Sequence, residues 1–272
     1  MIQLSIITIN YNDAIGLEKT IQSVTEQTFG NMEFIVIDGG SSDTSVEVIK
    51  KYEGRISYWI SEKDGGIFNA QNKGLAKAQG EYCLFLNSGD TLHSKTAIAS
   101  IFKRNPHADL VACNMAFVYE IGIEVRKQPK RVKEETLFLS SIWHPATLIK
   151  RNLFDTCGNY NEAFRIAADY DFFLKTALVN EVSYQHINVV LSNFDTTGVS
   201  SNPAHAQRHA EERRAIQKQY FDDNVIEHIE KLEKWSLSIT YRVGKKLQAS
   251  SWLSPLGSLI LFVSRLTNGL NR

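Results

Sequence analysis

The sequence predicts an α/β protein in which a mostly parallel sheet is flanked by helices. Two observations support this fold class. Apolar strand-like segments alternate with helical segments through the first half of the chain, and the segments 4–9 and 82–86 are apolar almost throughout. Continuous apolar runs are typical of strands buried on both faces. Because repeated β-α-β order produces parallel strands joined by right-handed crossovers, the alternation indicates a parallel sheet.

Each expected element rests on its own pattern. Apolar residues three or four apart, such as Ile21 and Val24, predict helices, whereas short apolar or alternating runs predict strands. Ser41, Ser42 and Asp43 are candidate caps for the second helix, and Gly122 marks an expected turn in the last segment. In chain order we expect a strand at 4–9, a helix at 14–27, a strand at 33–37, a helix at 46–49, a strand at 58–60, a helix at 67–78, strands at 82–86 and 110–113, and a strand or hairpin at 117–125.

Composition narrows the class of protein. The 272 residues, 43% of them hydrophobic, suffice for one large domain or for one domain with an appendage. Thirty Lys and Arg residues balance 30 Asp and Glu residues, so global charge gives no argument for nucleic acid, and we expect no nucleic-acid partner.

Cysteine usage and the N-terminal segment bear on the compartment. Cys83, Cys113 and Cys157 are odd in number and lack metal-ligand spacing, which favours buried thiols in a reducing cytosol. The apolar run at 4–9 is too short for a signal peptide and has no basic leader. We therefore expect a cytoplasmic protein.

Polar side chains end nearly every expected strand of the first half. In open α/β sheets, ligands lie beyond the carboxyl ends of the strands, so we expect these side chains to meet at one crevice. The turn after the first expected strand, residues 10–13, lacks a Gly-x-Gly-x-x-Gly motif, which argues against a dinucleotide site. No Gly-Lys-Ser/Thr sequence occurs, which argues against a P-loop. The residues concerned are Thr8, Asn10, Asp38, Asp64 and Asp90.

The segment Asn87-Ser88-Gly89-Asp90, directly after the apolar run 82–86, is the most informative of these strand ends. A carboxylate there suits Mg²⁺ or Mn²⁺ held against phosphates. The ordinary alternative is that such residues form turns or cap helices. We favour the cap for Asp43 and a ligand role for Asp38 and Asp90, because both of the latter end apolar strands.

Four segments, residues 4–12, 36–43, 64–74 and 80–90, together resemble family 2 glycosyltransferases of the GT-A fold. The resemblance covers roughly the first 200 residues, which is more than one short motif could give. It is closest to the bacterial branch that builds capsular, colanic-acid-like or O-antigen polysaccharide. It implies an inverting transfer of a sugar from a nucleoside diphosphate sugar to a hydroxyl of a saccharide or lipid-linked acceptor.

The resemblance implies roles for individual residues on the donor side. Many relatives carry an arginine where this chain has Gln71, and the first carboxylate of the Asp-x-Asp metal motif is replaced by Ser88. We therefore expect a weakly held Mg²⁺ or Mn²⁺ that depends on the donor phosphates, and a metal-dependent reaction. The implied roles are the nucleoside pocket for Thr8, Asn10, Tyr11 and Asp38, the donor site for Asp64 and Asn72, and the metal for Asp90.

On the acceptor side, residues 165–175 resemble the family's base motif, and Asp169 aligns with the catalytic base. Ala168 stands where relatives usually have glutamate. Asp171 points about 200° away from Asp169 on a helix, so the two cannot face one substrate. The alternative for Asp169 is a carboxylate that only stabilises the helix N-terminus.

Two weaker segments fit the acceptor side. His144 precedes an apolar run and could bind a phosphate or a sugar hydroxyl, or could equally be a structural histidine. Gly198 and Ser200 belong to a segment that resembles the family's Gly-Val-Ser loop, which would form a mobile lid. An ordinary connector is the alternative for that loop.

We expect a glycosyltransferase domain at 1–202, with a nucleotide-sugar half at about 1–113 and an acceptor half at 114–202, and a helical region at 203–272. From residue 234 to the end there are six basic residues and no acidic ones, beside an apolar stripe at helical spacing. This pattern favours an amphipathic helix on an anionic membrane surface, so the protein could be peripheral on the inner face of the membrane. Packing on the domain or a dimer contact would explain the same stripe.

Two rival functions remain open. A sugar nucleotidyltransferase would normally carry a glycine-rich basic loop after the first strand, which residues 10–13 lack. A non-catalytic sugar-nucleotide-binding partner of a synthase would be consistent with Ser88 and Ala168 in place of acidic residues.

Overall fold

The computed structural model describes residues 2–119, 121–180, 182–198, 202–229, 231 and 243. The chain forms two compact units, Met1–Asn202 and Pro203–Arg272. In the described part of the second unit, η5 (Pro203–His205) leads into α8 (Ala206–Tyr220). Ser200 and the basic segment from 234 on, apart from Val243, lie outside the described residues. Among the helices that are described, none has the length and apolarity needed to cross a bilayer.

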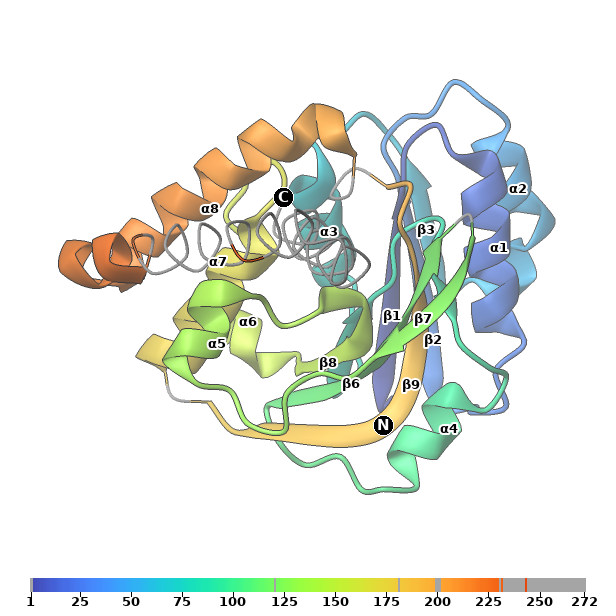
Figure 1. Cartoon of the computed structure of the whole chain (residues 1–272). Coiled ribbons are helices and arrows are strands. Elements are labelled where there is room, and N and C mark those ends of the chain that lie inside the picture. Colours follow the sequence, from blue (N-terminus) through green and yellow to red (C-terminus); the bar gives the residue numbers. More distant parts are fainter. Residues whose placement is uncertain are drawn as a thin grey trace, which may run out of the picture. The chain divides into compact units, whose positions relative to one another are not determined.

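The first half of the first unit forms the parallel part of a nine-stranded sheet (Figure 1). Its strands lie in the order β3-β2-β1-β4, and each neighbouring pair is parallel. The bounds are β1 (Leu4–Asn10), β2 (Met32–Asp38), β3 (Tyr58–Ser61) and β4 (Tyr82–Phe85), with α1 (Ala14–Thr25), α2 (Ser45–Lys51), η1 (Glu53–Arg55) and α3 (Ile67–Leu75) between them.

The second half adds strands of both directions. Beyond β4 the order is β8-β6-β9-β5, and β7 pairs with β6 outside this path. Only β6 and β9 are parallel among these pairs, while β4·β8, β6·β8, β6·β7 and β5·β9 are antiparallel. The strands are β5 (Thr91–Leu92), β6 (Leu110–Tyr119), β7 (Gly122–Arg126), β8 (Thr147–Lys150) and β9 (Tyr184–Asp195), and the helices are α4 (Ala97–Phe102), α5 (Glu134–Leu139), η2 (His144–Ala146), α6 (Asn152–Cys157), α7 (Ala168–Leu174) and the π-helical turn η3 (Lys175–Val179).

The predicted α/β class is confirmed, and the sheet is mixed rather than parallel throughout. The expected strand at 110–113 and the start of the next one are a single ten-residue strand, β6. Its pairing register with β9 shifts between Cys113 and Met115, where β9 carries additional residues. The expected turn at Gly122 joins β6 to β7 as a hairpin.

Helices cover both faces of the parallel half. Successive side chains of β1 point to opposite faces of the sheet, and apolar side chains on each face pack against a helix. Ile6 packs in a core cluster with Leu17 and Ile21 of α1. Ile7 faces α3, where a Cβ added to Gly74 would lie 2.5 Å from the Ile7 Cγ2. The strands are therefore buried on both sides, and their carboxyl ends are left to form a site.

At the amino ends of the strands, the buried carboxylate of Glu33 holds the segment that leads into β4. Glu33 accepts hydrogen bonds at Oε1 from the Ser5 hydroxyl at 2.5 Å and from the amides of Gln79 and Gly80 at 2.5 and 3.2 Å. Gly80 also donates to the Ser5 hydroxyl at 2.8 Å. This network requires close contact between the backbone at Gly80 and β1.

We predict that Gly80→Ala destabilises the protein. The added Cβ would lie 2.5 Å from the Ser5 amide nitrogen, so β1 would have to shift. Overpacking of this kind costs about 1–3 kcal/mol of unfolding free energy, measurable by urea denaturation. Gly30→Ala is the control, since a Cβ at Gly30 has nothing within 4 Å. Equal stability of the two variants would contradict the prediction.

Candidate functional site

A cavity of about 1060 Å³ lies at the carboxyl ends of the strands, and we refer to it as the main cavity. It collects most residues that the sequence singled out, from both halves of the first unit. Those that line it are Asn10, Tyr11, Asp64, Asp90, His144, Asp169 and Gly198. Thr8, Asp38 and Asn72 do not line it, and Ser200 lies outside the described residues.

Asp38 and Asn10 form a buried hydrogen-bond network directly beneath the main cavity's rim. They are register partners at the ends of β2 and β1, and the Asn10 amide donates to Asp38 at 2.8 Å. Asp38 also accepts from the Ser41 and Ser61 hydroxyls, both at 2.6 Å. Burial alone would raise the pKa of Asp38, but these bonds outweigh it and lower the pKa. Asp38 therefore holds the strand ends as a carboxylate, and its predicted nucleoside role stays a prediction.

Thr8 also acts within the sheet. Its side chain is fully buried, and its hydroxyl donates to the Leu86 carbonyl at 2.6 Å. The contact ties β1 to the residue that follows β4. A direct donor contact by Thr8 stays a prediction.

Gly39 brings Asp64 and Tyr11 together at one wall of the main cavity. A Cβ on Gly39 would lie 2.7 Å from Oδ2 of Asp64 and 3.3 Å from Cδ2 of Tyr11. The other oxygen of Asp64 accepts the Gly66 amide at 2.8 Å, which fixes the carboxylate at the start of α3. Tyr11 is 67% exposed. An exposed ring beside a fixed carboxylate can stack on a planar group and accept hydrogen bonds from hydroxyls.

Asp90 is held by contacts that its local sequence does not indicate. The buried Thr20 hydroxyl of α1 donates to the Asp90 carbonyl at 2.7 Å and accepts the Gly89 amide at 3.1 Å. Oδ1 of Asp90 accepts the Asp195 amide at 3.0 Å. Asp90 is only 4% exposed, and burial raises its pKa to about 8, with the nearby Asp195 charge adding to the rise. Neither Thr20 nor Asp195 was singled out from the sequence.

The two departures from the family pattern on the donor side, Ser88 and Gln71, have defined contacts. The Ser88 hydroxyl donates to Oδ2 of Asp13 at 3.0 Å, while Oδ1 of Asp13 caps α1 through the Gly16 amide. Gln71 is buried and donates to Oδ1 of Asn87 at 3.1 Å. Its Oε1 has no hydrogen-bond partner among the described residues, so it adds no charge and one unpaired acceptor beside the main cavity.

The donor set of the main cavity fits a divalent cation that shares its ligands with a phosphate. In the described part of the chain, no three His, Cys, Asp or Glu side chains gather as a metal site. Oδ2 of Asp90, however, receives no hydrogen bond from any described residue. Mg²⁺ is commonly held by one or two protein carboxylates together with waters and substrate phosphates, so the residues present fit such an ion.

Asp169 lies in the first turn of α7, on the opposite half of the first unit from Asp90, and lines the main cavity. Its Oδ1 accepts the Tyr170 amide at 2.8 Å. Asp171 is buried and is absent from the cavity lining, so the two carboxylates face different surroundings, as helical geometry predicts.

An aromatic cluster positions α7. Nε2 of His144 lies 2.7 Å from the Tyr160 hydroxyl, and the imidazole stacks on Phe85 at 4.8 Å between centroids. Burial lowers the pKa of His144 to about 3, so the ring is neutral at physiological pH. The phosphate or sugar-hydroxyl contact expected for His144 stays a prediction. Asn72 supports the same segment, because it exchanges hydrogen bonds of 3.0 and 3.1 Å with the Tyr160 backbone.

Cations at the main cavity come from positions that sequence reasoning did not assign. Lys19, Lys63 and Arg165 line it, against the carboxylates of Asp13, Asp64, Asp90, Asp169 and Asp195. Arg165 donates from Nη1 to the Gly65 carbonyl at the start of α3. Its place four residues before the predicted base was the available sequence signal. The carboxylates outnumber the cations, so an anionic ligand would need added positive charge.

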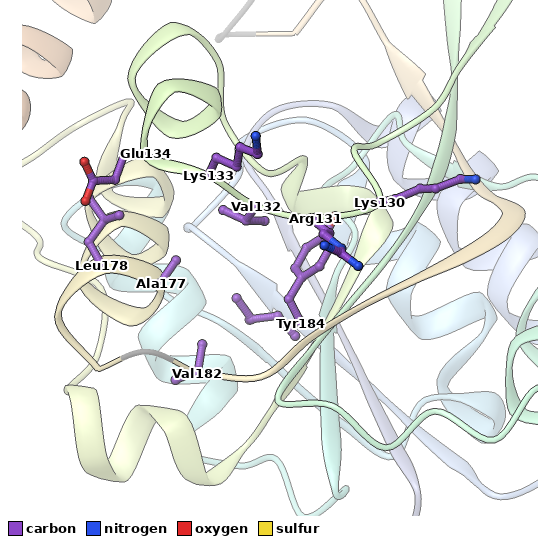
Figure 2. A pocket seen from close by; sticks show the side chains of 10 residues that line it. Lys130, Arg131, Val132, Lys133, Glu134, Ala177, Leu178, Val182 and Tyr184 are labelled. Atoms are coloured by element: carbon purple, nitrogen blue, oxygen red, sulfur yellow. The ribbon is translucent and has the colours of Figure 1, made fainter.

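A second hollow, of about 440 Å³, lies apart from these residues (Figure 2). Lys130, Arg131 and Lys133 reach it from the segment before α5, Leu178 from η3 and Tyr184 from β9. It contains none of the site residues predicted from the sequence. The main cavity is therefore the candidate active site.

Comparisons with known proteins identify the family of this chain. The model of "Glycosyl transferase family 2" matches residues 5–167. An uncharacterised glycosyltransferase of Mycobacterium tuberculosis is 35% identical over 204 residues, which cover 73% of this chain and 77% of that protein.

Two solved structures share the fold. TarS residues 1–349 of S. aureus, in complex with UDP-GlcNAc, has a TM-score of 0.60 at 19% identity, covering 99% of this chain and 89% of that one. A mannosyltransferase of Pyrobaculum calidifontis, in complex with GDP-Man and Mn²⁺, has a TM-score of 0.62 at 16% identity, covering 98% and 87%. The mixed α/β fold and the match over more than half of the chain lead to one conclusion: this chain belongs to glycosyltransferase family 2.

Proposed function

We propose that this protein is a metal-dependent inverting glycosyltransferase that moves a sugar from a nucleoside diphosphate sugar to a hydroxyl of a saccharide or lipid-linked acceptor in bacterial surface polysaccharide synthesis. The observation that carries the proposal is that Asp90 and Asp169, 79 positions apart in the sequence, line the same cavity. One carboxylate can serve the leaving diphosphate and the other the incoming hydroxyl, which are the two requirements of the transfer.

The nucleoside would bind at the wall formed by Tyr11, Gly39 and Asp64. The exposed Tyr11 ring offers a face for the base, and the Asp64 carboxylate accepts hydrogen bonds from ribose hydroxyls. The solved relatives hold UDP and GDP sugars, so the fold accommodates either nucleobase.

A metal ion at Asp90 and the nearby cationic side chains would balance the charge of the diphosphate. Bound Mg²⁺ or Mn²⁺ would supply the positive charge that stabilises the leaving diphosphate, and Asp90 would hold it. The mannosyltransferase complex with Mn²⁺ supports divalent metal use. Lys19 and Arg165 lie in the same cavity and would add charge where Gln71 supplies none.

Asp169 would take the proton of the acceptor hydroxyl as it attacks the anomeric carbon. Its bond from the Tyr170 amide and the first-turn position on α7 fix the carboxylate at the cavity wall. His144 acts as a neutral positioning residue behind α7, since its Nε2 is occupied by Tyr160. Gly198 also lines the cavity, which suits its predicted place beside the acceptor.

We predict that Asp169→Asn keeps donor binding and loses transfer. A positioned general base contributes about 10²- to 10⁴-fold, so the rate should fall by at least about 100-fold. The donor is first chosen by a thermal-shift screen of UDP and GDP sugars with and without Mn²⁺. The readout is the release of nucleoside diphosphate with and without acceptors.

Asp155→Asn is the matched control, because the Asp155 side chain on α6 is 71% exposed and lies outside the cavity lining. Near-normal transfer by Asp169→Asn would move the base elsewhere. Donor binding by the wild-type protein without turnover under any acceptor would instead support a non-catalytic binding partner.

We predict that Gly39→Ala weakens donor binding, because its Cβ would displace the Asp64 carboxylate and crowd Tyr11. A loss of about 1.4 kcal/mol, or about tenfold in affinity, is expected in calorimetric titration with the nucleoside diphosphate. Gly54→Ala, where a Cβ meets nothing within 4 Å, should bind as the wild type does. Unchanged affinity of Gly39→Ala would place the nucleoside away from this wall.

We predict that His144 makes folding stability depend on acid pH. Its folded pKa of about 3 lies below the ordinary value of 6.5, so the unfolded chain binds the proton more tightly. The stabilisation is complete above pH 6.5 and is lost by about 1.4 kcal/mol per pH unit as the pH falls towards 3.

Urea denaturation between pH 7 and 4 should therefore show a shallower loss for His144→Gln than for the wild type. An NMR titration provides the direct check, with the His144 imidazole signal assigned by its absence in the variant. A ring that protonates near pH 6.5 would show that His144 is accessible and able to carry charge in the site.

A further inference from the structure

Strand pairing brings a second carboxylate beside Asp90. In the antiparallel pair of β5 and β9, Thr91 lies opposite Asn193, and continuing that register by two residues places Gly89 opposite Asp195. The geometry agrees, since a Cβ on Gly89 would lie 3.2 Å from Oδ2 of Asp195. Gly89 has φ of +93°, a conformation suited to glycine, so this close approach is built into the turn.

Each of the two carboxylates has one oxygen occupied and one available. Oδ1 of Asp90 accepts the Asp195 amide at 3.0 Å. Oδ1 of Asp195 accepts the Thr197 amide and hydroxyl at 2.8 and 2.7 Å. Neither Oδ2 receives a hydrogen bond from a residue that the structure describes, and both residues line the main cavity.

A bound cation would stabilise this pair of carboxylates. No described Lys, Arg or His lies within ion-pair distance of Asp90 or Asp195. Two adjacent carboxylates repel each other, and a buried one is costly unless it is paired or binds a metal. Asp90, at 4% exposure, is such a buried group with a free oxygen at the cavity. The Ser88 hydroxyl donates its proton to Asp13, so it gives no hydrogen bond to either carboxylate.

We infer that Asp195 is the second protein ligand of the divalent cation. It lies at the end of β9 and supplies the carboxylate that is absent at Ser88. This inference rests on the proposed function. Oxygen ligands from two carboxylates, with the donor diphosphate and water completing the shell, are what Mg²⁺ and Mn²⁺ prefer. The ligand set is then divided between residues 105 positions apart in the chain.

The competing explanation is that Asp195 only positions Asp90 through its backbone amide. Asp195→Asn separates the two roles. An asparagine at 195 keeps the hydrogen bond from its backbone amide to the Asp90 carboxylate, and its side-chain oxygen can still accept hydrogen bonds from Thr197. Only the carboxylate charge is removed. A purely positioning role predicts no effect on cation affinity.

The test measures Mn²⁺ binding directly, by the loss of the free-ion EPR signal, to the full chain with Mn²⁺ alone and with Mn²⁺ plus UDP or GDP. We expect Asp195→Asn and Asp90→Asn each to weaken Mn²⁺ binding in the nucleotide complex by about 10- to 100-fold. Asp155→Asn should bind as the wild type does. Thermal denaturation of each variant without metal checks that it is folded.

The outcomes distinguish this inference from the proposed function. If Asp90→Asn weakens Mn²⁺ binding and a folded Asp195→Asn does not, the inference is overturned while the proposed function stands. If the wild-type protein binds neither nucleotide with Mn²⁺, both fail. Weakening by both substitutions, with nucleotide affinity in the absence of metal unchanged in Asp195→Asn, supports the inference.

Discussion

The buried hydroxyl of Thr20 is the contact on which the site depends. It donates a hydrogen bond to the Asp90 carbonyl and accepts one from the Gly89 amide, so it pairs one carbonyl and one amide of the turn that follows β4. The turn is thereby joined to α1, whose own first turn is capped by Asp13, the partner of Ser88. Because unpaired backbone groups are costly in a buried place, this contact fixes the direction in which the Asp90 carboxylate leaves the sheet.

Sequence patterns were sufficient for residues whose role follows from their place at the end of a strand. The alternation of segments predicted the parallel half, and the polar residues at Asn10, Asp64 and Asp90 do line one cavity. Asp169, which resemblance to a known family singled out, lines the same cavity. These inferences needed only local periodicity and the rule that ligands bind beyond carboxyl ends of strands.

What the sequence did not indicate depends on contacts between distant segments. The two-residue strand β5 has no recognisable pattern, yet its pairing with β9 determines that Asp195 lies beside Asp90. Asn72 was expected in the donor site, whereas its described hydrogen bonds go to the Tyr160 backbone and to the Glu162 carboxylate, both in the segment before α7. Side-chain direction is decided by tertiary packing, which a motif match does not contain.

The link between Asp90 and Asp195 also has a consequence for the order of assembly. A chain that had formed only the parallel strands would possess Asn10, Tyr11 and Asp64, but not the neighbour of Asp90 that arrives with β9. Closing a loop of 105 residues is an entropic cost met late in folding. The environment of the buried carboxylate therefore exists only in the finished sheet, once β9 has paired with β5.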